Sequence, residues 1–198
     1  MRFHWGAVPK SPDFTPDEAW KPLKQLSPWL AQLASLPVGL AAAAGVVVLW
    51  FTITPLRHVA LIFSLPDFLI ASIGFVIVHE LIHAAAHPLA GRSSRSLLGI
   101  WPSRLIAYAY YDGELTRNRL VTILLMPFLV ITFAPLLFSV ITRSVSVWVA
   151  FVSVLNALGS SVDILFAAML LVQVPPAGVV RNQGWWSYWR VTPAAGGP

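Results

Sequence analysis

The sequence predicts an all-α membrane protein: a bundle of about four transmembrane helices with a short β-hairpin-like loop between the second and third. Two observations carry this prediction. The chain is 57% hydrophobic and only 11% charged, whereas soluble domains are about 25% charged. Its apolar residues also gather into four long runs, each of a length that can cross a bilayer. The 198 residues suit one membrane domain.

The four predicted spans differ in their polar content. The first, 36–53, and the third, 120–141, hold no ionisable residue. The third contains two prolines, which neighbouring helices can accommodate in a membrane. The second, 69–90, carries several ionisable residues, and the fourth, 147–172, contains Asp163. Charges inside a span are expensive unless they are paired or bind a metal, so the second and fourth spans are the candidates for function.

Polar segments flank the spans and set the predicted domain boundaries. We expect a cytoplasmic or interfacial segment at 1–35, the transmembrane domain at 36–174 and a cytoplasmic Trp-rich tail at 175–198, which reads as loop. The Thr15-Pro16 pair followed by Glu18 is typical of a helix start and predicts a short interfacial helix. An irregular, proline-broken segment fits the same residues equally well.

The loop between the second and third spans contains strand-like sequence. Residues 105–111 are rich in aromatic side chains, and Asp112-Gly113 separates them from 114–116. An Asp-Gly pair between such runs predicts a β-hairpin, and 97–101 can add another strand.

The distribution of Lys and Arg predicts the orientation. Eleven of these residues lie in the two terminal segments and the 91–119 loop, and only Arg57 and Arg143 lie on the other side; Arg57 shares a short predicted loop with His58. This places both termini and the hairpin loop in the cytoplasm. The net charge of +5 is dispersed over loops in this way, so nucleic acid is excluded as a partner.

His79-Glu80-Leu81-Ile82-His83 is the motif that carries chemistry. On a helix, positions i and i+4 share a face, so both imidazoles can reach one metal ion, and Glu80 lies beside them as a general base. The chain has no cysteine, so any metal ligand is His, Asp or Glu. A helix end that simply meets water at the membrane surface is the alternative reading of the motif.

A catalytic zinc ion needs a third protein ligand, and three residues compete for this role. His87 continues the i, i+4, i+8 spacing of histidines on one helix face. It lies about 12 Å from His79 along the axis of an unbroken helix. We therefore expect it outside the ligand set, as a neighbour of the ligands. Glu114 lies beside a predicted turn. Asp163 is preferred, because it is an acid inside a span and its depth matches that of His79 and His83.

Asn156 and Ser160 share a predicted helix face with Asp163. Asn156, and Ser160 between it and the acid, are candidates for holding a substrate backbone or an oxyanion. Both residues can equally serve as hydrogen-bonding contacts between helices.

The His79-to-His83 motif, together with the segment from Asn156 to Asp163, resembles site-2 protease-type intramembrane metalloproteases. The four-span layout with an aromatic loop before the third span resembles a family of small bacterial and archaeal integral-membrane proteins, the "putative zincin peptidase" family. The likeness covers residues 66–172. Here Ile164 follows Asp163, where site-2 proteases usually have glycine.

These resemblances imply a zinc metallopeptidase of a prokaryotic cytoplasmic membrane. Zn²⁺ would be held by His79, His83 and Asp163, with Glu80 as the catalytic base, and the substrate would be a membrane protein or peptide. The hairpin loop would hold that substrate extended, although its tyrosines suit the membrane interface as well. A non-catalytic metal-binding or scaffold protein of the bilayer is the alternative function.

Overall fold

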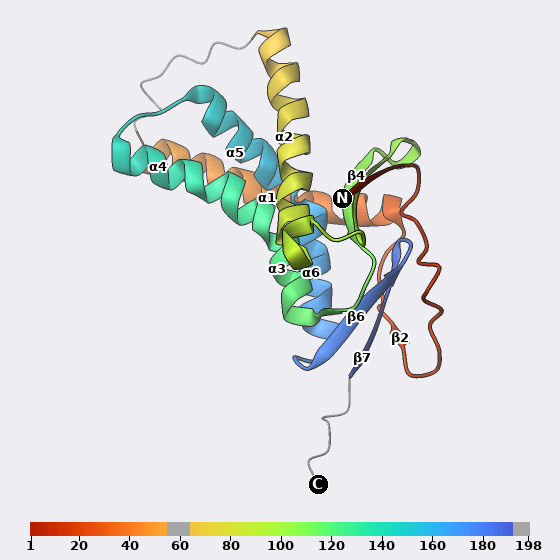
Figure 1. The fold of residues 1–198 in the computed structure, drawn as a ribbon. Coiled ribbons are helices and arrows are strands. Elements are labelled where there is room, and N and C mark those ends of the chain that lie inside the picture. The colour runs from red at the N-terminus through yellow and green to blue at the C-terminus, as the bar shows by residue number, and fades with distance from the viewer. Residues whose placement is uncertain (55–63, 192–198) are drawn as a thin grey trace.

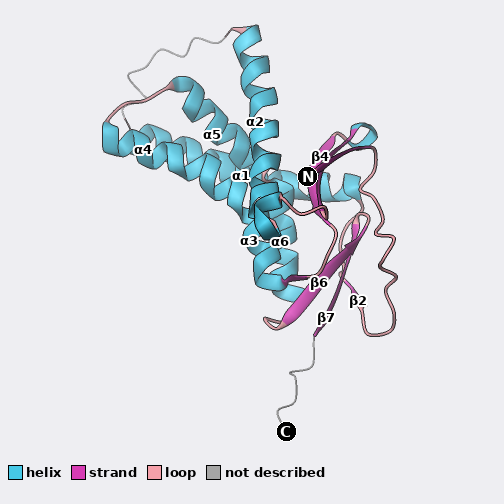
Figure 2. Ribbon diagram, in the orientation of Figure 1, coloured by secondary structure: helices cyan, strands magenta, loops and turns pink. Residues whose placement is uncertain are grey.

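The computed structural model describes residues 1–54 and 64–191, and it is mostly helical (Figures 1 and 2). The predicted loop with Arg57 and His58, and the last seven residues of the tail, lie outside the described residues. The helices are α1 (Pro28–Ile53), α2 (Leu65–Ala86), α3 (Arg117–Pro127), the π-helix η4 (Phe128–Phe133), α4 (Ala134–Thr142), α5 (Val147–Gly159) and α6 (Ser161–Gln173).

Three helical segments are long and apolar enough to cross a membrane: α1, α2 and the continuous run Arg117–Thr142. A fourth results if α5 and α6, which are bent by 44° at a short break, count as one span. The structure therefore has three or four apolar helices of membrane-spanning length, as the hydropathy pattern predicts.

Helix α2 is shifted toward the N-terminus relative to the predicted 69–90. It begins one turn earlier, because the Ser64 side chain accepts a hydrogen bond from the backbone N–H of Asp67 and caps the helix. It ends at Ala86, because His87 precedes a proline and adopts an extended conformation. The next residues form a tight turn in which Leu89 has a φ of 57°.

Two sheets correct the all-α prediction. One has the order β1 (Arg2–Trp5), β3 (Ser96–Trp101) and β4 (Ile106–Tyr111); the other has the order β2 (Lys21–Pro22), β7 (Trp186–Val191), β6 (Gly178–Gln183) and β5 (Leu115–Thr116). β1 pairs with β3 in parallel, and the other pairs are antiparallel. Most of these partners are far apart in sequence, so a local reading of each segment does not reveal them.

The observed hairpin joins β3 and β4 through Pro102–Arg104, with Leu105 at a φ of 53°. The prediction of a hairpin turn at Asp112-Gly113 is wrong, because the strand that follows, β5, pairs with β6 of the second sheet. The backbone N–H of Asp112 instead donates to the carbonyl of Arg95.

The terminal segments also differ from the predictions. The interfacial helix predicted near Thr15 is absent, and this part of the N-terminal segment is irregular, which confirms the alternative interpretation of these residues. The described part of the tail is the β6–β7 hairpin, which turns at Gly184 with a φ of 64°. Gln25 and Trp185 link the two segments, since the Gln25 side chain donates to the Trp185 carbonyl at 2.7 Å.

The sheets lie together at one end of the helices, as Figure 1 shows, and the C-terminal half of α2 packs against α3 and the β3–β4 hairpin. The opposite half of α2 extends beyond the sheets. Near the bend, a side chain on Gly159 would approach the Phe75 ring to 2.7 Å, so this glycine lets α2 come close. The C-terminal half of α2 is thus the place where the sheets meet the helical bundle.

Candidate metal centre

Three side chains from two helices converge at this meeting point. His79 and His83 lie one turn apart on α2, and both are buried. Their Nε2 atoms are 3.1 Å apart. Asp163, in the first turn of α6, brings its Oδ2 atom to 3.1 Å from His79 Nε2 and 3.4 Å from His83 Nε2. Two imidazole nitrogens and one carboxylate oxygen therefore form a nearly equilateral triangle.

This triangle has the dimensions of a zinc site. Nitrogen and oxygen ligands lie about 2.1 Å from Zn²⁺, so two ligands of a tetrahedral ion are roughly 3.4 Å from each other. The three observed separations of 3.1, 3.1 and 3.4 Å are close to this value. Two neutral imidazoles and one carboxylate also form a donor set that zinc uses in catalytic sites. The cluster of His79, His83 and Asp163 can hold a metal ion.

The outer nitrogen of each imidazole has a protein acceptor. His79 Nδ1 lies 2.8 Å from Asn156 Oδ1, and His83 Nδ1 lies 2.8 Å from the carbonyl oxygen of Ile123. Each acceptor oxygen accepts a hydrogen bond from a protonated Nδ1, so the proton of the neutral ring is on Nδ1. The Nε2 atom then has a free lone pair directed at the triangle. Such outer partners fix the ring orientation and tautomer of metal-ligating histidines.

The carbonyl of Ile123 is available because of Pro127. In an α-helix this carbonyl would accept the N–H of the residue four positions later, and proline has no N–H. The Ile123 carbonyl oxygen can therefore accept a hydrogen bond from His83 Nδ1 on the neighbouring helix. From the sequence alone, Pro127 is only an irregularity that a membrane helix tolerates. The missing donor at i+4 is the signal that could have pointed to Ile123.

Both the oxygen and the nitrogen of the Asn156 side-chain amide make hydrogen bonds. Its Nδ2 donates to the Pro127 carbonyl at 3.0 Å and to Thr132 Oγ1 at 2.9 Å, while its oxygen accepts from His79. The residue is fully buried. Thr132 lies in the π-helix η4, a distortion that often occurs at functional sites. An oxyanion role for Asn156 would require it to release one of these partners.

Ser160 occupies the break between α5 and α6 and is fully buried. Within the described part of the chain its hydroxyl makes no hydrogen bond, and its backbone N–H donates to the Asn156 carbonyl at 2.8 Å. The bend at Ser160 starts a new helix, which places Asp163 in the first turn, beside the positive end of the helix dipole. That placement favours a charged carboxylate.

Glu80 lies beside the triangle on α2. One of its carboxylate oxygens, Oε2, is buried and has no hydrogen-bond partner among the described residues. Strand β4 packs against α2. A buried carboxylate oxygen without a hydrogen-bond partner is available to accept a proton.

The other two ligand candidates lie elsewhere. His87 is buried just beyond the end of α2, and its ring lies 5.6 Å from the ring of Tyr111. Burial lowers the pKa of His87 to about 4, and the charges of His83 and Arg119 add to this effect. Glu114 is exposed and forms an ion pair with Arg190 at 3.1 Å. Neither residue belongs to the metal-binding cluster.

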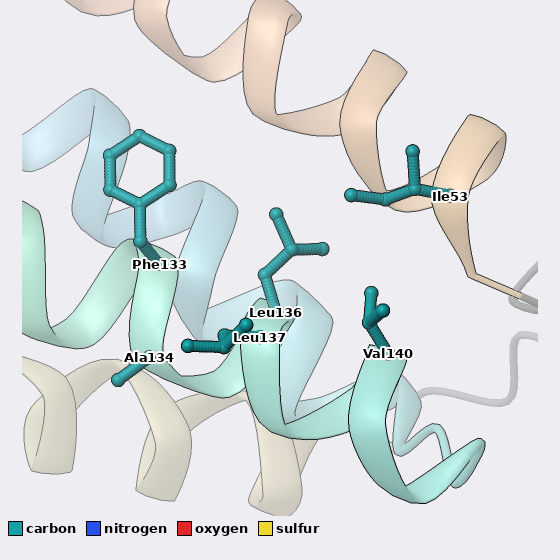
Figure 3. A pocket seen from close by; sticks show the side chains of 6 residues that line it. All are labelled: Ile53, Phe133, Ala134, Leu136, Leu137 and Val140. Atoms are coloured by element: carbon teal, nitrogen blue, oxygen red, sulfur yellow. The ribbon is translucent and has the colours of Figure 1, made fainter.

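A cavity of about 450 Å³ lies away from the metal centre, between the end of α1 and α4 (Figure 3). It is lined by apolar side chains: Ile53, Phe133, Ala134, Leu136, Leu137 and Val140. With no polar or titratable group in its lining, it offers no catalytic chemistry.

Comparison with known proteins agrees with the geometry of the centre. Residues 72–179 match a family model described as "putative zincin peptidase". The chain belongs to this family. The matched residues include both α2 histidines and Asp163. A search of curated proteins and a search of solved structures gave no match. Membership of a zincin family implies zinc as the metal and peptide hydrolysis as the chemistry.

Proposed function

We propose that this protein is a zinc-dependent endopeptidase embedded in the membrane, which cleaves membrane proteins or membrane-associated peptides within the bilayer or at its edge. The observation that carries the proposal is the triangle of His79 Nε2, His83 Nε2 and Asp163 Oδ2, which has zinc-site dimensions and lies beside a glutamate with one buried, unpaired carboxylate oxygen. Intramembrane cleavage of the site-2 protease type is the form of activity that the spans and the cross-helix ligand set favour.

Each residue of the centre has a distinct task in this proposal. When bound, zinc activates a water molecule as nucleophile and polarises the scissile carbonyl. Glu80 accepts a proton from the attacking water at Oε2 and delivers it to the leaving nitrogen of the cleaved peptide bond. Asn156 and the Ile123 carbonyl keep the two imidazoles in the ligating tautomer. Burial of both histidines keeps bulk water away from the ligands.

Strand β4 is the proposed binding element for the substrate. It lies at the edge of its sheet, paired on one side with β3, and it packs against α2, the helix that carries Glu80. An extended peptide can add to such an edge through backbone hydrogen bonds. Proline at alternate positions of 106–111 should abolish cleavage while zinc remains bound. Unchanged cleavage would remove β4 from the substrate path.

We also propose that both termini and the β3–β4 hairpin lie in the cytoplasm. The pairing of β1 with β3 and of β2 with β7 supports a common side, because the N-terminal segment, the hairpin loop and the tail share two sheets. The excess of Lys and Arg in these segments favours the cytoplasmic side.

Elemental analysis of detergent-purified protein tests the centre directly. We expect about one zinc per chain, and we expect it to be lost in both His79→Ala and Asp163→Ala. Loss in His79→Ala alone would exclude Asp163 as a ligand. A wild-type protein without zinc, even after reconstitution, would refute the proposal.

Glu80→Gln separates a peptidase from a non-catalytic metal-binding or scaffold protein. The substitution keeps the shape of the side chain and removes its ability to accept a proton. We expect full zinc content with cleavage of a membrane-peptide substrate reduced at least about a hundredfold. If the variant kept both its zinc and the biological function of the wild type, the non-catalytic metal-binding or scaffold protein would be supported instead.

A further inference from the structure

A second cavity, of about 650 Å³, lies where the N-terminal segment meets the end of the β3–β4 hairpin and β6. Three separate parts of the chain contribute charged side chains to its lining. The charged residues are Arg2, Lys10, Asp13, Arg95, Asp112 and Arg181. A volume of this size is in the range of sites for small molecules.

This cavity and the metal centre lie on opposite faces of the sheet. Tyr110 and its β3 partner Leu97 line the cavity. Their neighbours in β4 point the other way, because successive side chains of a strand alternate between faces. The ring of Tyr111 lies 5.6 Å from the ring of His87, just beyond the end of α2, and α2 packs against β4. The cavity is therefore a separate site and not an extension of the catalytic one.

The charge of the lining is unbalanced. Four cationic side chains face two carboxylates, and His4 also contributes to the wall. The closest opposite charges are Arg181 Nη2 and Asp112 Oδ1 at 3.6 Å, which is too long for a hydrogen bond. Buried Arg181 Nε and buried Asp112 Oδ1 make no hydrogen bond among the described residues. The positive charge is thus only partly neutralised from within the protein.

Arg181 is nevertheless held in place. Its guanidinium lies 4.6 Å from the centre of the Phe14 ring, and its Nη2 donates to Ser11 Oγ at 3.2 Å. A guanidinium that is positioned by an aromatic ring and one hydrogen bond, with another N–H donor unpaired, is suited to bind an oxyanion. Arg95 and Arg2 are exposed and can close on the same ligand from the hairpin and from β1.

We propose that this cavity binds a phosphate-bearing anion between the N-terminal segment, the hairpin and β6. Phosphate oxygens match the planar donors of arginine, and a ligand of this charge offsets the excess of cations. The phosphate can belong to a soluble molecule or to the headgroup of an anionic lipid, since the chemistry that the cavity recognises is the same. Binding would tie residues 2–13 to the hairpin.

Hydrogen exchange on the full-length, zinc-loaded protein tests this site. One sample in detergent receives inorganic phosphate, and another is placed in phosphatidylcholine nanodiscs with or without phosphatidylglycerol. We expect slower exchange in 2–13 and 94–97. Protection by inorganic phosphate identifies a soluble ligand, and protection that appears only with phosphatidylglycerol identifies a lipid headgroup. No protection by either probe overturns the proposal.

A pair of matched variants tests whether the lining of this cavity is responsible for the binding of phosphate or of the lipid headgroup. Arg2→Gln/Arg95→Gln removes two exposed cations from the lining, and Lys24→Gln/Arg143→Gln removes two exposed cations elsewhere. We expect the first to weaken binding at least about tenfold and the second to leave it unchanged, with zinc content constant in both. Equal weakening in the two variants would show a general charge effect and refute a built site.

Discussion

The two halves of α2 have similar apolar composition, but only the second half has buried residues. In the first half the large side chains are exposed: Leu65 is 70%, Ile70 71% and Ile73 61% accessible. In the second half His79 and His83 are 5% and 6% accessible, because α3, α5 and β4 pack against α2. Figure 1 shows the first half extending past the sheets. One helix thus provides both a surface suited to lipid and a covered metal centre.

The two halves of α2 constrain their residues to different degrees. Contact with lipid requires only apolar side chains, so many residues can serve there. The second half places ring nitrogens against specific acceptors on α5 and on the α3 backbone, and these contacts are lost if one atom is removed. The tolerance of α2 to substitution should therefore change sharply between Ile73 and His79.

The largest expected difference is between His83→Ala and Ile73→Ala. Removing His83 takes away one of three ligands, so zinc affinity should fall by more than about a hundredfold. Ile73→Ala removes an exposed apolar side chain and should leave affinity within about twofold, since this residue has no part in the triangle. Competition with a zinc chelator measures both. Equal losses would mean that the two halves are not functionally distinct.

The next largest effect should come from Asn156→Ala. This change leaves His79 Nδ1 without its acceptor, and loss of such a partner typically costs about 10- to 100-fold in metal affinity. Ser153→Ala is the matched control, because Ser153 is equally buried on α5 but bonds Trp50 and the Thr132 carbonyl. If both variants bind zinc like the wild type, the acceptor on His79 is dispensable.

Pro127→Ala should weaken zinc binding by roughly tenfold. The new N–H can donate to the Ile123 carbonyl within the helix, where it competes with His83 Nδ1 for the same oxygen. Pro135→Ala restores an N–H in the same span and should have no effect on zinc, which makes it the control. The same chelator titration applies, and equal affinities for the two variants would show that competition at Ile123 is unimportant.

The smallest effect concerns His87, at the end of α2. Its pKa of about 4 lies below the ordinary value of 6.5, so the unfolded chain takes up a proton at a pH where the native protein does not. Stability should therefore fall as pH drops below 6.5, by about 1 kcal/mol at pH 6. His87→Gln should remove this part of the pH dependence.

Thermal unfolding in detergent at pH 7.5 and pH 6 measures this change. The quantity compared is the shift of the melting temperature between the two pH values, which should be smaller for His87→Gln than for the wild type. An identical shift in the two proteins would mean that His87 takes up its proton as readily in the native state as in the unfolded one.

The sequence by itself determined the apolar helices and two of the three residues of the metal centre, and it favoured Asp163 as the third. Hydropathy depends on local composition, so three of the predicted spans appear as continuous helical segments with ends shifted by up to eight residues. The spacing of His79 and His83 is equally local, because four residues on a helix place both rings on one face. The strand at 97–101 is also visible in the sequence, and the structure extends it by one residue.

Only the tertiary structure decided how these elements combine. The approach of Asp163 to the two histidines depends on the bend at Ser160 and on α3, which packs against both α2 and α6. No local pattern records this packing. The acceptors for the imidazoles are a backbone oxygen at Ile123 and an amide 77 residues from His79 along the chain. Strand partners are set in the same way, and β5 pairs with β6 despite the local signal for a turn at Asp112-Gly113. Local sequence fixes which groups are available, whereas contacts between distant segments depend on the packing of the whole chain.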